Sequence, residues 1–254
     1  MAKTIAVANQ KGGVGKTTTA VNLAAVFGSM DEKVLLVDAD PQGNATSGLG
    51  VDKRQCPVTV YEVMIGGETA SKAICHTQYK NLDLLAASID MAGGEIEMAS
   101  MERREDRLKI PLQEVKDNYD YIIIDCPPSL GLITTNSLNA SDSILIPIQC
   151  EFYALEGLSQ LINTVRRVKR QYNSMLELEG VLLTMYDGRL NLTQQVVTEV
   201  KKFFPRKVYS TVIPRAVRLS EAPGFGQPVE YYDHYSKGAR AYRELAREIL
   251  KKKG

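Results

Sequence analysis

A glycine-rich segment near the N-terminus, Lys11-Gly12-Gly13-Val14-Gly15-Lys16-Thr17-Thr18, constrains the fold of this 254-residue chain more than any other feature. It follows an apolar run at residues 4–8 and precedes a helical pattern at residues 19–27. Strand, glycine loop and helix in this order are the context that a phosphate-binding loop requires. Glycines let backbone N–H groups converge on phosphate oxygens, and the helix N-terminus adds a partial positive charge. We therefore expect Lys16 to reach the β- and γ-phosphates of a nucleotide and Thr17 to bind Mg²⁺ through its hydroxyl.

Two later apolar runs end in carboxylates, at Asp38 and Asp40 after residues 34–37 and at Asp125 after residues 121–124. We expect Asp38 and Asp40 to point in different directions and to have different roles. Asp125 is expected to hold Mg²⁺ directly or through a water molecule. A lone aspartate at a strand end is often only a turn residue, and this alternative stays open for Asp38. The order of the three motifs nevertheless favours a nucleotide site.

The spacing of apolar runs predicts the fold class. Because helical patterns separate most of these runs, we expect an α/β protein with a mainly parallel, twisted sheet and helices on both faces, of the P-loop NTPase type. No linker rich in Pro, Gly or Ser divides the chain, so residues 1–254 are expected to form a single domain. Segment 43–80 reads as irregular and segment 91–118 as helical and charged. A terminal amphipathic helix is expected over residues 238–253. The strand-like runs are 4–8, 34–37, 82–86, 121–124, 143–148, 180–184 and 208–213.

Composition restricts the compartment and the partners. No apolar stretch is long enough to span a membrane and no signal peptide is apparent, so we expect a cytoplasmic protein. The four cysteines show no C-x-x-C spacing, which favours reduced thiols over a metal site. Residues 1–160 contain 13 Lys/Arg and 21 Asp/Glu, a net charge of −8, whereas residues 161–254 contain 18 and 9, a net charge of +9. The two values sum to the +1 of the chain, and a basic last third favours binding to a polyanion such as nucleic acid.

One departure from the common phosphate-binding motif makes the assignment more specific. The position five residues before Gly15 is Gln10 rather than glycine, and a second lysine, Lys11, opens the loop. This pattern, K-G-G-x-G-K-T-T, resembles the deviant Walker A motif of the ParA/MinD family of ATPases. The segments at residues 40–46, 147–157, 183–187 and 212–215 extend the resemblance over nearly the whole chain. It is closest to the short chromosomal ParA proteins of the Soj type.

The resemblance implies roles for individual residues. Lys11 would cross a dimer interface to the nucleotide of the other subunit, and Lys11, Lys16 and Asp40 would be the catalytic residues. Thr17, Asp38 and Asp125 would form the Mg²⁺ site. Met185 and Pro214 would border the adenine. The nucleotide-binding residues implied are Lys11, Gly12, Gly13, Val14, Gly15, Lys16, Thr17, Thr18, Met185 and Pro214.

The resemblance also implies a function in chromosome partitioning. ATP and Mg²⁺ would close a homodimer that binds double-stranded DNA without sequence preference, and a ParB-type centromere-binding protein would stimulate slow hydrolysis and release. The protein would then be nucleoid-associated. Some relatives also control replication initiation, so a replication initiator stays open as a further partner. The implied DNA contacts are basic residues of the C-terminal part, namely Arg189, Arg218, Arg240, Arg243, Arg247 and Lys251.

Three other functions stay open from sequence alone. A MinD-like membrane-cycling ATPase would need a terminal helix with large apolar residues facing the bilayer, but the helix here lacks Phe and Trp and ends in lysines. An electron-transfer ATPase like the nitrogenase iron protein would need bridging cysteines, and Cys126 and Cys150 lack the Cys-Gly-Gly setting of that family. A P-loop kinase or synthetase would need a second-substrate site, which is not evident in the sequence.

Overall fold

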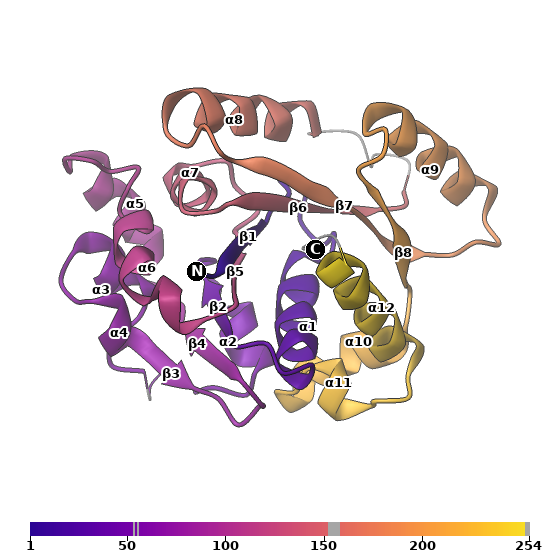
Figure 1. Cartoon of the computed structure of the whole chain (residues 1–254), viewed down its shortest axis with the longest axis horizontal. Coiled ribbons are helices and arrows are strands. Elements are labelled where there is room, and N and C mark those ends of the chain that lie inside the picture. Colours follow the sequence, from indigo (N-terminus) through magenta and orange to yellow (C-terminus); the bar gives the residue numbers. More distant parts are fainter. Residues whose placement is uncertain (53, 55, 152–157, 252–254) are drawn as a thin grey trace.

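The computed structural model describes all residues except 53, 55, 152–157 and 252–254, and it contains one eight-stranded sheet (Figure 1). The strand order is β3-β4-β2-β5-β1-β6-β7-β8. All neighbouring strands are parallel except β3 and β4, so the mainly parallel sheet is confirmed. The strands are β1 (Lys3–Val7), β2 (Val34–Asp38), β3 (Ile74–His76), β4 (Leu82–Leu85), β5 (Tyr121–Asp125), β6 (Ser143–Gln149), β7 (Glu177–Tyr186) and β8 (Val208–Pro214).

Helices cover both faces of this sheet, and each face has its own apolar core. One core packs α1, α2, α10, α11 and α12 against the sheet, and the other packs α3 to α9 (Figure 1). The first of these layers has the bounds α1 (Lys16–Ser29), α2 (Asn44–Gly48), α10 (Val217–Glu221), η3 (Ala222–Phe225), α11 (Val229–Tyr232) and α12 (Lys237–Lys251). The second has α3 (Val60–Ile65), α4 (Ala70–Ala73), α5 (Met91–Ala99), α6 (Lys109–Val115), η2 (Lys116–Asn118), α7 (Leu132–Asn139), α8 (Leu158–Gln171) and α9 (Asn191–Phe203).

Strand register brings the three sequence motifs to one edge of the sheet. Val7, the last residue of β1, lies beside Asp125 of β5, and Asp125 lies beside Asp38 of β2. These strands are apolar and buried on both faces, which is why their sequences read as continuous apolar runs. The loop after β1 and both carboxylates therefore converge at the carboxyl ends of central strands, where open α/β sheets bind ligands.

The segment predicted as irregular, residues 43–80, contains three short helices and the edge strand β3. Its clearest signal is a capping box, in which the backbone N–H of Thr59 donates to Glu62 at 2.7 Å and Thr59 Oγ1 accepts from the N–H of Tyr61 at 3.3 Å. The T-x-x-E spacing was readable in the sequence. Strand β3 has only three residues and no apolar run of its own, so no periodicity could have predicted it.

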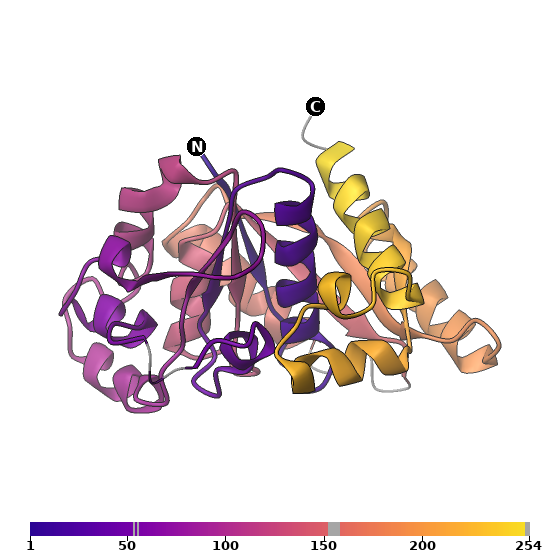
Figure 2. The same cartoon turned by 90° about the horizontal axis from the view of Figure 1, so that it is seen from below.

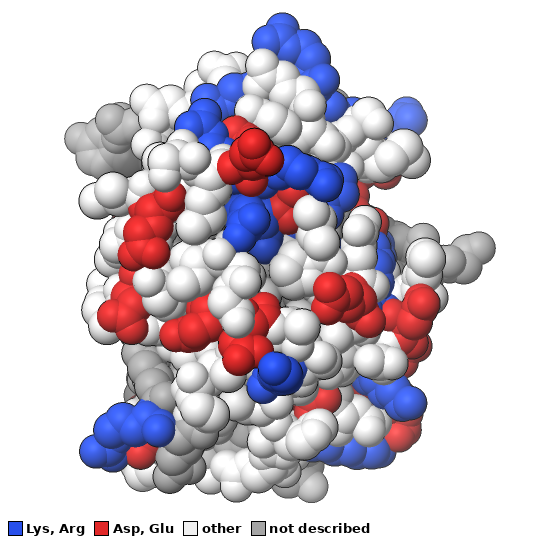
Figure 3. Space-filling view, turned by 90° about the vertical axis from the view of Figure 1, so that its left-hand side faces the viewer, with Lys and Arg blue, Asp and Glu red and all other residues white. Residues whose placement is uncertain are grey.

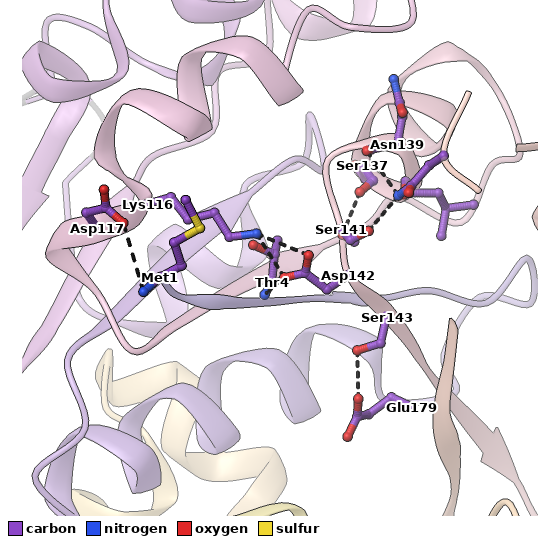
Figure 4. Close-up of polar contacts among 12 residues, drawn as sticks. Met1, Thr4, Lys116, Asp117, Ser137, Asn139, Ser141, Asp142, Ser143 and Glu179 are labelled. Carbon is purple, nitrogen blue, oxygen red and sulfur yellow. Dashed lines mark hydrogen bonds and ion pairs between the residues drawn. The ribbon is translucent and has the colours of Figure 1, made fainter. Parts of the chain in front are cut away.

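Polar contacts join neighbouring strands at their amino ends, opposite the carboxyl ends that carry the nucleotide motifs (Figure 4). Asp142, just before β6, accepts from the N–H of Thr4 at 2.7 Å and pairs with Lys116 at 3.0 Å. Ser143 donates to the buried Glu179 of β7 at 2.7 Å. These contacts tie β1, β6 and β7 together at their amino ends, away from the nucleotide motifs.

Candidate nucleotide-binding site

The glycine loop takes a conformation that suits an anion. Gly13 and Gly15 have φ angles of 72° and 87°, in the left-handed region that residues with a Cβ rarely adopt. The backbone N–H of Thr19 donates to Gly15 O at 2.9 Å, which begins the hydrogen-bond ladder of α1. The N–H groups that precede it have no acceptor within that ladder. They sit at the positive end of a 14-residue helix and can donate to phosphate oxygens.

Lys16 is held in the centre of this loop. Its side chain is buried, and Nζ donates to the carbonyl of Lys11 at 3.1 Å. Burial lowers the pKa of Lys16, while the charges of Asp125, and then of Cys126 and Asp40, act in the opposite direction. A phosphate would supply the negative charge that this ammonium group lacks in a buried setting.

The two carboxylates at the end of β2 have different surroundings, because the strand ends at Asp38 and Asp40 lies beyond it. Asp38 is fully buried, and one of its oxygens accepts from both the N–H and the hydroxyl of Thr46, each at 2.7 Å. Burial raises the pKa of Asp38 to about 6, although the Thr46 bonds lower it. Asp40 accepts from the N–H of Gln42 at 3.0 Å and retains some exposure. Asp40, at 7% exposure, is less deeply buried than Asp38, at 0%.

Asp125 gives the strongest indication of a cation-binding position. It is fully buried, and neither carboxylate oxygen has a well-formed hydrogen bond within the described residues. Burial raises its pKa well above the ordinary value, and the charge of Asp38 adds to this, while the nearby Thr17 hydroxyl acts weakly in the other direction. Oxygen ligands from Asp and Thr beside a phosphate loop fit Mg²⁺. The residues present therefore suit the ion that the sequence implies, and Asp38 Oδ1, also without a partner there, adds a further oxygen.

A cavity of about 320 Å³ adjoins the loop and brings distant segments together. The structure places Met185 and Pro214 in its lining with Gly15 and Thr18. Met185 has a φ angle of 49°, an unusual conformation for a side chain of this size, at the end of β7. Thr184 joins the end of β7 to the glycine loop, because its hydroxyl donates to the carbonyl of Val14 at 2.8 Å. The remaining lining residues are Thr184, Ile213, Arg215, Ala216, Leu219, Ser220 and Tyr242.

The first lysine of the loop stands apart from this cavity. Lys11 Nζ lies 3.9 Å from Glu151 Oε2, and Arg215 approaches the other oxygen of Glu151 at 3.8 Å. A Cβ built on the neighbouring Gly12 would meet no described atom within 4 Å. Among the described residues, nothing therefore fills the space beside Gly12.

Comparison with known proteins identifies the family. Residues 2–178 match the family described as an AAA domain. The sporulation initiation inhibitor protein Soj of Bacillus subtilis is 58% identical over 249 residues, 98% of each chain. The chromosome partitioning protein ParA of Myxococcus xanthus is 50% identical over 98% of this chain and 88% of its own. The chain belongs to the ParA/Soj family of chromosome-partitioning ATPases.

Solved structures agree on the fold. A Mycobacterium smegmatis structure named cobyrinic acid a,c-diamide synthase, with a bound ATP analogue and magnesium, is 39% identical with a TM-score of 0.87 over 99% of this chain and 95% of its own. The cell division ATPase MinD of Pyrococcus furiosus is 29% identical with a TM-score of 0.82 over 99% of both chains. The predicted ParA/MinD resemblance is confirmed, and the partitioning proteins, at 48–58% identity, are nearer than MinD.

Two further residues, Asn9 and Thr46, position parts of this site, although neither was predicted as a site residue. Asn9 donates to Pro147 O at 2.7 Å and accepts from the N–H of Lys11 at 3.1 Å, so it anchors the start of the loop to β6. Thr46 holds Asp38 and also accepts from the N–H of Ala87 at 3.1 Å. A polar residue inside an apolar context, as at Asn9, was the available signal. Nothing in the sequence links Thr46 to Asp38, because that contact depends on how α2 folds back.

The six basic residues proposed for DNA occupy two regions. Arg189 and Arg218 follow the carboxyl ends of the adjacent strands β7 and β8 and are paired with acidic neighbours, Arg189 with Asp187 at 2.6 Å and Arg218 with Glu221 at 2.8 Å. The end of α12, which carries Arg247 and Lys251, lies at the end of the molecule where the N-terminus lies (Figure 2). Arg240 is exposed near the start of α12.

Arg243 differs from the other five because its side chain is only 15% exposed and pairs with the buried Glu230 at 2.7 Å. A phosphate contact by Arg243 would compete with that pair. The flank over α3 to α6 and β3 shows acidic and basic side chains intermixed (Figure 3). No uniformly basic surface is visible on that face.

Proposed function

We propose that this ParA-family ATPase is an ATP-dependent DNA-binding switch of chromosome partitioning. ATP and Mg²⁺ close a homodimer, the dimer binds double-stranded DNA without sequence preference, and a ParB-type partner stimulates hydrolysis and release. The observation that carries the proposal is the buried carboxylate of Asp125, beside Lys16 at the mouth of the glycine loop, which has no well-formed hydrogen bond among the described residues. This arrangement fits a nucleotide–Mg²⁺ complex, whose charges would satisfy both groups.

Each residue of the site has a distinct part in this proposal. Lys16 exchanges the carbonyl of Lys11 for the β- and γ-phosphates, while the N–H groups at the start of α1 donate to the same oxygens. Thr17, Asp38 and Asp125 would hold Mg²⁺, which when bound neutralises charge on the phosphate oxygens. Asp40 orients the attacking water. Met185 and Pro214 enclose the adenine in the 320 Å³ cavity. Lys11 reaches the nucleotide of the partner subunit, whereas Gly12, Gly13 and Val14 belong to the loop around the nucleotide of their own subunit.

The DNA surface is proposed to centre on Arg189 and Arg218, which follow the ends of β7 and β8. Arg240 would contact DNA as well, and Arg247 and Lys251 would form a separate group. Both strand-end arginines lie at the nucleotide edge of the sheet, so a γ-phosphate that closes the dimer can also set the spacing of the two copies. Phosphate contacts of this kind carry no base information, which agrees with binding that ignores sequence. Such binding would place the protein on the nucleoid. Control of a replication initiator would be a further output of the same ATP-bound dimer.

The membrane-cycling alternative is weaker on one specific observation. The apolar stripe of α12, with Ala241, Leu245 and Ile249, is buried against β8 and α1 rather than presented outwards. None of the described helices has the length and apolar character needed to cross a membrane. The electron-transfer alternative needs cysteines accessible at a subunit interface, whereas Cys126 and Cys150 are both buried.

Replacing Asp40 tests the switch directly. Asp40→Ala should retain ATP binding and ATP-dependent DNA binding but lose most turnover, because the water-orienting carboxylate is gone while Lys16 and Asp125 remain. Turnover is measured by phosphate release, and DNA binding by fluorescence anisotropy with a labelled duplex. Lys16→Ala is the matched control and should lose nucleotide binding itself. Wild-type turnover in Asp40→Ala would assign water activation to another residue and reject this mechanism.

A further inference from the structure

Two of the four cysteines face each other beside β3, the outermost strand on one side of the sheet. Cys56, in the segment between α2 and α3, lies with its sulfur 3.1 Å from the sulfur of Cys75, the middle residue of β3. Both thiols are free, Cys56 is buried and Cys75 is half-buried. The other two cysteines, Cys126 and Cys150, belong to the apolar core on the opposite face of the sheet.

The sulfur atoms of this pair are close enough that a bond would need little further approach. Cys75 is fixed because β3 pairs with β4, where Cys75 lies beside Leu84. Cys56 is fixed because its side chain belongs to the core on the α1 face of the sheet. The sulfurs need to approach by only about 1 Å to reach disulfide length. The pair is 19 residues apart in sequence, so a bond would close a loop of moderate length.

We propose that Cys56 and Cys75 form a reversible intramolecular disulfide by exchange with a low-molecular-weight disulfide of the glutathione type. The more exposed Cys75 reacts first: its thiolate attacks one sulfur of the reagent, forms a mixed disulfide and releases one small thiolate. Cys56 then gives up its proton to solvent and attacks the sulfur of Cys75, which releases the second small thiolate. Two protein thiols lose two electrons, and one small disulfide becomes two small thiols.

The environment of Cys56 sets the order of the two steps. Burial raises the pKa of Cys56 to about 12, and the neighbouring thiol of Cys75 adds to the effect. Cys56 therefore stays protonated while Cys75 carries a free thiol, and capping of Cys75 removes the part of the shift that Cys75 causes. In a reducing compartment the pair would be reduced at rest and would oxidise only when small disulfides accumulate.

The bond would restrain a segment that is connected to the nucleotide site, a property beyond the proposed ATPase cycle. Cys56 follows α2, and Thr46 of α2 holds Asp38 through two hydrogen bonds. Tyr79, just after β3, donates from its hydroxyl to Gly226 O at 2.7 Å, next to the cavity-side helices α10 and α11. A disulfide that joins the segment after α2 to β3 should therefore make this part of the chain more resistant to unfolding.

Thiol counting in the purified full-length chain tests the proposal. Incubation with oxidised glutathione should reduce the thiols that react in denaturant from the four cysteines of the chain to two, and the intact mass should show the loss of two hydrogen atoms without a glutathione adduct. Peptide mapping should recover a peptide joining Cys56 to Cys75, and the melting temperature should rise by several degrees. Dithiothreitol should reverse all of these changes.

Single-cysteine variants make the result specific. Cys75→Ser should keep three reactive thiols and an unchanged melting temperature under the same oxidant, whereas Cys150→Ser, the matched control, should still form the cross-link. Four reactive thiols in the oxidant-treated wild-type chain would overturn the proposal. A stable glutathione adduct on Cys75, or a cross-link between two chains, would overturn it equally, because each shows that Cys56 does not resolve the mixed disulfide.

Discussion

At the scale of single residues, the site buries charged groups at a cost in folding free energy, and a bound ligand can reduce that cost. Asp38, Asp125 and Lys16 are all buried, and burial shifts the pKa of each towards its neutral form. A site built in this way is less stable when empty than a neutral one of the same shape, since buried charges without partners are costly. Binding of a nucleotide with its cation then contributes stability as well as chemistry.

Asp38 allows this idea to be measured. Its pKa is raised from 3.8 to about 6 in the folded chain, so the folded state holds more protons than the unfolded state between these values. Unfolding free energy should therefore fall as pH rises through this window and then stay lowered above it, by about 3 kcal/mol at pH 7. Asp38→Asn removes this loss, so the nucleotide-free variant should melt higher than the wild type at neutral pH.

The pH dependence separates this effect from ordinary repacking. Calorimetry of both nucleotide-free proteins should show the difference shrinking as pH falls from 7 towards 4. An advantage of Asp38→Asn that is the same at all pH values would mean that the charge of Asp38 is not its source.

Gly12 tests the proposed contact between subunits. Because a Cβ at Gly12 meets no described atom within 4 Å and no left-handed φ is required there, Gly12→Val should fold normally, with a change of less than about 0.5 kcal/mol in stability. It should bind ATP as a monomer but fail to dimerise, since the branched side chain occupies the space that the partner approaches. Light scattering with ATP gives the oligomeric state. An ATP-dependent dimer of this variant would remove Lys11 and Gly12 from the interface.

At the scale of elements, periodic apolar patterns predicted the strands and helices whose formation depends on burial in or against a regular sheet. All seven predicted strands are present within a few residues, and α12 has the predicted stripe. The sequence could not predict β3, which forms because β4 offers an unpaired edge. It also could not predict the contact of Tyr242 in α12, whose hydroxyl lies 3.2 Å from the hydroxyl of Thr19. Such contacts join segments remote in sequence, and only the folded chain brings them together. The nucleotide loop was predictable because its residues are consecutive.

Leu245 tests whether the stripe of α12 is core. Leu245 is fully buried, so Leu245→Ala should lower the free energy of unfolding by about 2–5 kcal/mol. Arg247→Ala, on the exposed side of the same helix, is the control and should change stability little. Denaturant titration measures both. A helix meant for a bilayer would instead lose vesicle binding in Leu245→Ala at unchanged stability, and that outcome would revive the membrane-cycling alternative.

At the scale of the whole molecule, charge and nucleotide chemistry divide along the chain but meet at one edge of the sheet. Residues 1–160, with the three nucleotide motifs, have a net charge of −8, and the remainder has +9. The strand-end arginines Arg189 and Arg218 come from the basic part, yet they follow β7 and β8 on the edge where the glycine loop lies. A change at the γ-phosphate could therefore alter the proposed DNA surface on the same side of the sheet.

The most direct measurement is the affinity of the chain for two unrelated DNA duplexes with ATP and with ADP, at rising salt. We predict binding with ATP, little with ADP, equal affinity for both sequences, and a steep salt dependence. In Arg189→Ala and in Arg218→Ala the slope of log affinity against log salt should fall by about two units for a symmetric dimer, with ATP binding unchanged. Equal DNA affinity with ATP and ADP would contradict the account.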